Sequence, residues 1–161
     1  PELAAHVTKM AKEAASKPVY VKLSPNVTDI VEIAKAVEAG GGNGVSLINT
    51  LLGMAIDIHR RKPVLGNTYG GLSGPAVKPV ALRMVHQVYK GVTIPIIGLG
   101  GIMTGTDAIE FMMAGAQAVQ VGTATMVDPT AISRIAREMS EYVEQYNLNS
   151  ITDIVGAVHQ A

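Results

Sequence analysis

Residues 94–101 read Ile-Pro-Ile-Ile-Gly-Leu-Gly-Gly, and residues 118–123 read Ala-Val-Gln-Val-Gly-Thr. Each stretch is a short apolar run that ends in small residues and precedes a helical pattern, as is typical of a parallel strand buried on both faces. Bare backbone at the carboxyl end of such a strand offers N–H groups to an anion. Two successive strands of this kind match the phosphate site of (β/α)8 barrels, which the loops after strands 7 and 8 build. The pair therefore predicts a phosphorylated ligand.

Composition and charge argue against several classes of protein. The chain of 161 residues has 13 basic and 13 acidic side chains, and the basic ones cluster only at residues 59–62, so nucleic-acid binding has little support. No apolar run approaches the roughly 18 residues of a membrane span, and no secretion signal is visible, so we expect a cytoplasmic protein without membrane contacts. Because the chain has no cysteine, disulfides, thiolate metal sites and a cysteine nucleophile are excluded within it.

The hydrophobic pattern alternates between helix and strand. We expect helices over residues 3–15, 28–39, 77–89, 105–114, 128–146 and from 150 onward, and strands over 19–24, 44–50, 94–99 and 118–122. Such alternation implies parallel strands joined by right-handed crossovers. We predict an α/β fold, the C-terminal half of a (β/α)8 TIM barrel, because a whole barrel needs about 250 residues and the glycine ends need neighbours to close their site. A complete four-stranded open sheet is the alternative.

Residues 51–76 are rich in glycine and proline and are expected to be irregular. The segment is too long for a simple connector, and loops of this length are usually functional. Its end, residues 70–75, reads Gly-Gly-Leu-Ser-Gly-Pro and offers backbone amides to an anion or a ring edge. A glycine-rich turn without any ligand is the alternative.

Polar side chains at the strand ends are the candidates for chemistry. Lys22 ends an apolar strand at the catalytic face of a barrel, where it serves as a fixed cation or forms a Schiff base; a snorkelling or salt-bridged lysine is the alternative. Asn49 and Thr50 end the next strand and can read a planar polar ligand, or they simply start a turn.

The two glycine-ended strands supply the phosphate candidates Gly100, Gly101, Gly122 and Thr123. Close packing between helix and strand is the alternative reason for small residues at a strand end. It explains either strand end taken singly, but it explains two successive strand ends of this kind less well. The histidines have no metal-ligand spacing, so we predict no metal site and expect solvated or packed rings at His6, His59, His86 and His159. Asp107 and Asp128 are expected to start helices rather than to act as an acid–base pair.

Five motifs together resemble the dihydroorotate dehydrogenase family. They follow the family's order and spacing, and the likeness covers essentially the whole chain. The sequences Leu-Ser-Gly-Pro-Ala and Ile-Asn-Thr are most similar to those of the class 1B, NAD-linked bacterial form. The motifs are Val21-Lys22-Leu23-Ser24-Pro25-Asn26, Ile48-Asn49-Thr50, Gly70-Gly71-Leu72-Ser73-Gly74-Pro75-Ala76-Val77-Lys78-Pro79, Gly98-Leu99-Gly100-Gly101-Ile102 and Val121-Gly122-Thr123-Ala124.

The resemblance implies an FMN-binding barrel that oxidises dihydroorotate to orotate in pyrimidine biosynthesis. Lys22 would lie against the N1/C2-carbonyl edge of the flavin and stabilise its reduced, anionic form. Ile48 and Gly74 would contact the FMN, and Asn49 and Thr50 would hold the orotate. The FMN phosphate would be held by Gly100, Gly101, Gly122 and Thr123.

One departure from the family limits what the chain does alone. Class 1 enzymes use a loop cysteine to remove the C5 proton, and this chain has neither a cysteine nor the family's first half. Residues 1–161 are therefore expected to be the C-terminal half of the FMN-binding domain, inactive by itself.

The resemblance also implies partners: a separate electron-transfer subunit with FAD and a [2Fe–2S] cluster, and a homo-oligomer. Two alternatives remain. One is a phosphosugar-binding barrel, an isomerase or lyase, and the other is a non-catalytic half barrel that acts only by association.

Overall fold

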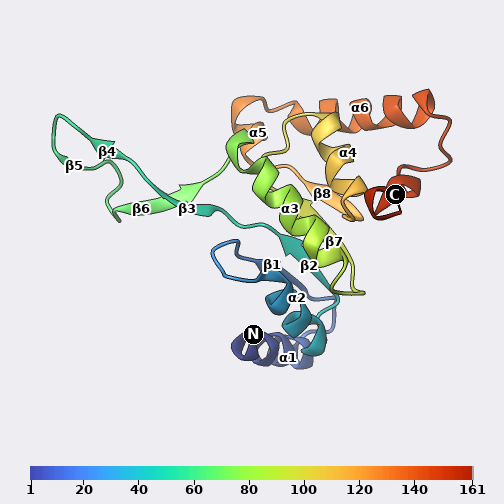
Figure 1. Cartoon of the computed structure of the whole chain (residues 1–161), viewed down its shortest axis with the longest axis horizontal. Coiled ribbons are helices and arrows are strands. Elements are labelled where there is room, and N and C mark those ends of the chain that lie inside the picture. The colour runs from blue at the N-terminus through green and yellow to red at the C-terminus, as the bar shows by residue number, and fades with distance from the viewer. Residues whose placement is uncertain (161) are drawn as a thin grey trace.

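The computed structural model describes residues 1–160, and its centre is a four-stranded parallel sheet in the order β1-β2-β7-β8 (Figure 1). The strands are β1 (Tyr20–Leu23), β2 (Gly44–Leu47), β7 (Ile96–Leu99) and β8 (Ala118–Gln120). All three pairings are parallel, so each connection must cross over from one end of the sheet to the other. The α/β fold and the four strands agree with the prediction, with each strand two or three residues shorter.

The helices are α1 (Glu2–Ala14), α2 (Ile30–Ala39), α3 (Lys78–Tyr89), α4 (Gly105–Met113), α5 (Thr123–Val127) and α6 (Ala131–Gln145), with 3-10 turns η1 (Pro75–Val77), η2 (Ile151–Ile154) and η3 (Ala157–His159). Helices α2, α3 and α4 pack on one face of this sheet, α1 packs on α2, and α6 packs on α4 and α5. The core packs Val45 and Leu47 of β2 against apolar residues of α2, α3 and α4. Gly98 of β7 permits a close approach of α4, because a Cβ there would lie 2.6 Å from Cδ1 of Phe111.

The opposite face of the sheet is largely uncovered. Side chains in one register row of a parallel sheet share a face, and the row of Lys22, Ser46 and Ile97 lies on the face away from the core helices, although Ser46 in the middle of the sheet is itself buried. Tyr20, Lys22, Ala118 and Gln120 on this face are exposed. Within residues 1–160, the outer edges of β1 and β8 also pair with no other strand. A face and two edges are thus open, as expected for half of a closed barrel.

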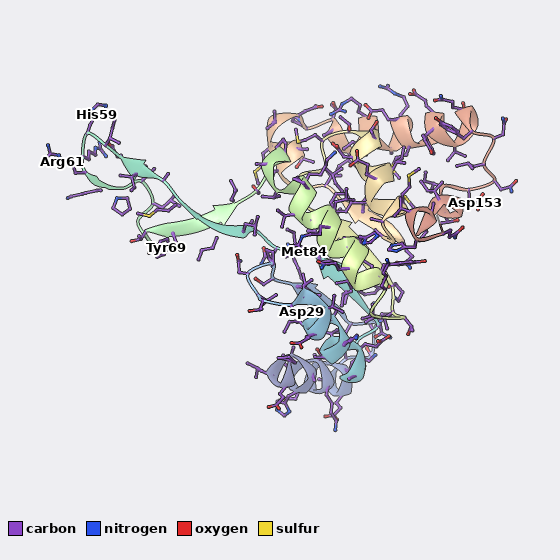
Figure 2. The ribbon with its side chains drawn as sticks, in the orientation of Figure 1. Asp29, His59, Arg61, Tyr69, Met84 and Asp153 are labelled. Carbon is purple, nitrogen blue, oxygen red and sulfur yellow. The ribbon has the colours of Figure 1, made fainter. Side chains whose placement is uncertain are left out.

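The prediction of an irregular segment over residues 51–76 was wrong. β3 (Leu51–Met54) pairs with β6 (Tyr69–Leu72), and β4 (Ile56–Asp57) pairs with β5 (Lys62–Pro63), both antiparallel. Together they form an arm that projects far from the sheet, with His59 and Arg61 at its far end (Figure 2). Glycine and proline in these short strands hide the alternation that marks a strand.

The chain after β8 also differs from the prediction. Residues 123–127 form the short helix α5, and α6 begins at Ala131 rather than at Asp128. The Asp128 carboxylate accepts hydrogen bonds from the backbone and hydroxyl of Thr130, at 2.9 and 2.6 Å, so it caps a turn before the helix. Ser150 and Asp153 form a capping box, which opens a 3-10 turn instead of the α-helix predicted from residue 150 onward.

Two of the four histidines join the C-terminus to the helical layer. The His159 ring stacks between His86, at a centroid distance of 4.2 Å, and Tyr89, at 4.6 Å. Its Nε2 lies 3.0 Å from the carbonyl oxygen of Ala114. Burial, with smaller contributions from His159 and Lys90, holds the pKa of His86 below its usual 6.5. The expectation of a packed ring holds at both positions, whereas His6 and His59 are exposed.

This stack predicts that the fold loses stability in mild acid. A histidine whose pKa is lowered by folding binds protons more readily in the unfolded chain, so the unfolding free energy falls as the pH drops below about 6.5. His86→Phe keeps an aromatic ring against His159 but removes the titrating group. The unfolding free energy, measured in urea, should therefore change less between pH 7 and pH 5 than it does in wild type. His6→Gln, which changes an exposed histidine, should leave this pH dependence as it is. An equal pH dependence in all three proteins would contradict the account.

Candidate functional site

A pocket lies at the carboxyl edge of the sheet, and all nine residues predicted from sequence line it. These are Lys22, Ile48, Asn49, Thr50, Gly74, Gly100, Gly101, Gly122 and Thr123. The structure thus brings together segments up to about a hundred residues apart, while what they bind stays a prediction. Several other members of the lining were not predicted as site residues: Leu72, Ser73, Val77, Leu99, Ile102, Met103, Gln120 and Ala124.

The glycines after β7 are required by the backbone itself. Gly100 and Gly101 have φ of 130° and 77°, which strain any residue with a Cβ. A Cβ on Gly101 would lie 2.8 Å from both the Gly74 carbonyl oxygen and the Lys78 nitrogen. The loop therefore lies flat on the start of α3, and packing alone explains its glycines. This is the alternative that the sequence analysis left open for either strand end taken singly.

Gly122, after β8, has no such reason to be glycine. Its φ is −113°, and a Cβ added there would meet no atom within 4 Å among the described residues. Because glycine has no side chain, nothing at Gly122 itself covers the backbone N–H groups at this end of the pocket. The Thr123 hydroxyl beside it donates to Ser73 Oγ at 2.9 Å, so two hydroxyls border the same space. Gly122 is thus the phosphate candidate that packing explains least.

A charged cluster under the pocket fixes the loop after β7. The Asp107 carboxylate accepts hydrogen bonds from the backbone N–H groups of Met103 and Thr104, both at 2.9 Å, and from Lys78 Nζ at 2.6 Å. Burial opposes ionisation of Asp107, but these bonds outweigh it and hold its pKa below the usual value. The same contact, together with Glu110, raises the pKa of Lys78. Asp107 lies in the first turn of α4, as predicted, where it forms a capping box with the N-cap residue Thr104.

Lys22 brings a positive charge to the pocket. Its side chain is exposed, on the uncovered face of the sheet. It has no ion-pair partner in the described part of the chain, so the salt-bridged alternative is not seen there. An unneutralised cation of this kind favours an anionic or electron-rich ligand group.

The end of β2 contributes an apolar and a polar contact. Ile48 is 2% exposed, and its N–H donates to the Leu99 carbonyl oxygen at 2.9 Å; the peptide bond before it is cis. Asn49 and Thr50 are exposed, and Asn49 Oδ1 accepts from the Thr50 N–H at 2.9 Å. This local bond gives the turn interpretation some support, while leaving the Asn49 amide N–H groups and the Thr50 hydroxyl facing the pocket region.

Other kinds of site are not found. Residues 1–160 hold no group of three or more histidine, aspartate or glutamate side chains that could bind a metal ion. In the same residues, no helix has both the length and the apolar character needed to cross a bilayer.

Comparison with known proteins points to one family. The family model described as dihydroorotate dehydrogenase matches residues 1–143. Two similar relatives are both named dihydroorotate dehydrogenase B (NAD(+)), catalytic subunit. The protein from Desulforamulus reducens is 64% identical over 97% of this chain and 51% of its own length. The protein from Geobacter sp. strain M21 is 60% identical over 98% of this chain and 52% of its own length. The chain spans about half the length of the curated relatives it matches.

The charged cluster predicts a stability loss that depends on pH. Asp107→Asn removes a partly buried bond to a charged group, so the unfolding free energy at pH 7 should fall by about 1–3 kcal/mol. Folding lowers the pKa of Asp107, so its contribution is present above the unfolded value of 3.8 and is lost as the pH falls through the lower folded value. The difference from wild type should therefore shrink in strong acid, as measured by urea unfolding.

Asp153→Asn is the matched control, because Asp153 occupies the same capping-box position in η2 but is exposed. It should cost less stability at pH 7 than Asp107→Asn. If the two variants lost the same unfolding free energy, the contact between Asp107 and Lys78 would add no stability beyond that of the helix cap.

Proposed function

This chain belongs to the dihydroorotate dehydrogenase family, and from this we propose that residues 1–161 form the C-terminal half of an FMN-binding (β/α)8 barrel. The whole protein would oxidise dihydroorotate to orotate in pyrimidine biosynthesis. The observation that carries the proposal is the pocket, where a free cation, an amide–hydroxyl pair and two glycine strand ends meet at one edge of the sheet.

The residues around the pocket fit FMN by their chemistry. Accessible backbone at Gly122, beside the hydroxyls of Thr123 and Ser73, suits the phosphate. Lys22 would supply positive charge to the flavin ring. The apolar side chain of Ile48 and the backbone of Gly74 would contact the same ring. FMN, when bound, accepts the hydride from dihydroorotate.

The substrate contacts come from the end of β2. Asn49 and Thr50 carry both donors and acceptors and lie exposed at the pocket. Orotate is a planar ring with amide and carboxylate groups, so paired hydrogen bonds can fix its orientation. These residues would bind the substrate and fix its orientation. The family resemblance implies a loop cysteine as the base that removes the C5 proton, and because this chain has no cysteine, we propose that this base lies elsewhere in the full-length protein.

Partners follow from what this chain lacks. The open sheet face and the unpaired edges of β1 and β8 suit the remaining strands of a barrel. The relatives' name contains both NAD(+) and "catalytic subunit", which supports a separate electron-transfer subunit. A [2Fe–2S] cluster is held by cysteine thiolates, so the cluster and its FAD would belong to that subunit. We also propose a homo-oligomer, which the exposed apolar side chains of the arm favour.

The role of Gly122 can be tested apart from folding. Gly122→Ala places a methyl group where no atom of the described chain lies, so the unfolding free energy should change by less than about 0.5 kcal/mol. The methyl would crowd the phosphate, so FMN should bind at least about tenfold more weakly, a cost of about 1.4 kcal/mol. Flavin fluorescence titration of the full-length protein measures this affinity.

Gly66→Ala is the matched control, because a Cβ at Gly66 also meets no atom within 4 Å but Gly66 lies on the arm. It should change neither stability nor FMN affinity. Unaltered FMN binding in Gly122→Ala would remove Gly122 from the phosphate site.

The role of Lys22 is tested by turnover. Lys22→Met keeps the length of the side chain but removes the charge, so kcat for dihydroorotate oxidation in the full-length protein should fall about 100-fold, with the fold intact. Lys17→Met, which changes an exposed lysine before β1, should turn over like wild type. A colourless wild-type protein that binds a phosphosugar instead of flavin would contradict the proposed function and favour the isomerase or lyase alternative.

A further inference from the structure

The side chain of Asn26 joins two segments that border the pocket. Asn26 lies three residues after β1, the strand that carries Lys22. Its Nδ2 donates to the Thr50 carbonyl oxygen at 3.0 Å and to Ser24 Oγ at 3.3 Å, and its Oδ1 accepts from the Leu52 N–H at 2.9 Å. One side chain thus holds the backbone on both sides of Leu51, the first residue of β3, where the arm begins.

The chemistry of these contacts requires an amide. The Leu52 N–H can only donate and the Thr50 carbonyl can only accept, so the orientation of the Asn26 amide is determined by its partners. An aspartate in this place would keep the bond from Leu52 but would set a carboxylate oxygen against the Thr50 carbonyl. The lost donor and the repulsion would both move Thr50 away.

Thr50 is also held from its other side. A Cβ on Gly71 of β6 would lie 2.7 Å from Thr50 Cβ, so the Thr50 side chain packs directly on bare backbone of the arm. Its carbonyl is bound by Asn26 and its side chain by β6. The position of Thr50 at the pocket therefore depends on both contacts.

We propose that Asn26 is a positioning residue, which sets Thr50, and with it the adjacent Asn49, against Lys22 and so determines the affinity for the planar substrate. Asn26 itself is not among the residues that line the pocket. The inference rests on the proposed function, because it assigns Asn49 and Thr50 to orotate. Since the FMN contacts lie mainly on other strands, loss of the Asn26 amide should affect substrate far more than flavin.

The test compares Asn26→Asp and Asn26→Ala with wild type in the full-length protein. Both variants should raise KM for dihydroorotate and Kd for orotate about tenfold, while FMN content and kcat stay within about threefold. Asn26→Ala should also speed hydrogen exchange at the Leu52 amide about tenfold, whereas Asn26→Asp, which retains that acceptor, should not. Asn67→Asp adds the same charge on the exposed arm and should behave like wild type.

The outcomes separate this inference from the proposed function. If wild type binds orotate and Asn26→Asp binds it equally well, the positioning role is overturned and the proposed function stands. A fall in FMN content and kcat that accompanies the rise in KM would also overturn the positioning role, since Asn26 would then support the fold as a whole. If wild type binds neither FMN nor orotate, the proposed function fails and this inference fails with it.

Discussion

The carboxyl ends of β1, β2, β7 and β8 meet at one edge because the four strands pair in parallel and in register. Lys22 and Ser46 lie side by side in this register, as do Leu99 and Gln120. Each crossover then delivers a new loop to the same edge. The strand-end residues of the pocket, such as Lys22 and Gly122, depend on this pairing, since it brings segments far apart in the chain to one edge.

The loops at this edge are fixed by contacts below and beside the pocket rather than within it. Asp107 and Lys78 hold the loop after β7 from beneath, and Asn26 holds the start of the arm from the side. Rigid support of this kind keeps binding groups in place before a ligand arrives, which lowers the ordering cost of binding. The pocket residues themselves are left with free hydrogen-bonding groups and an unpaired charge.

Much of the architecture could be predicted from sequence because periodicity reports burial directly. The strands around Val45 and Ile96, and the helix that places Ala34 and Val37 in the core, follow the patterns of buried elements. The common location of the site candidates could be predicted because strand ends of a parallel sheet share one edge, while the ligand proposed there comes from the family resemblance.

Other features could not be predicted, for physical reasons that differ. The arm pairs short strands that contain Gly53, Gly70 and Pro63, and such strands have no clear alternation. The helix α5 has five residues, too few for a period to emerge. The bond between Lys78 and Asp107 spans 29 residues, and the contacts of Asn26 depend on how two loops meet. Long-range polar contacts leave no local pattern in a sequence.

The central claim is that this chain supplies the flavin and substrate contacts but needs the rest of a barrel to act. The direct measurement is a titration of the purified 161-residue chain with the separately produced other half of the protein, in the presence of FMN, followed by dihydroorotate oxidation. We expect no steady oxidation by the chain alone. As the other half of the protein is added, the oxidation rate should rise and reach saturation at a molar ratio of one to one. Steady oxidation by the chain alone would contradict the central claim.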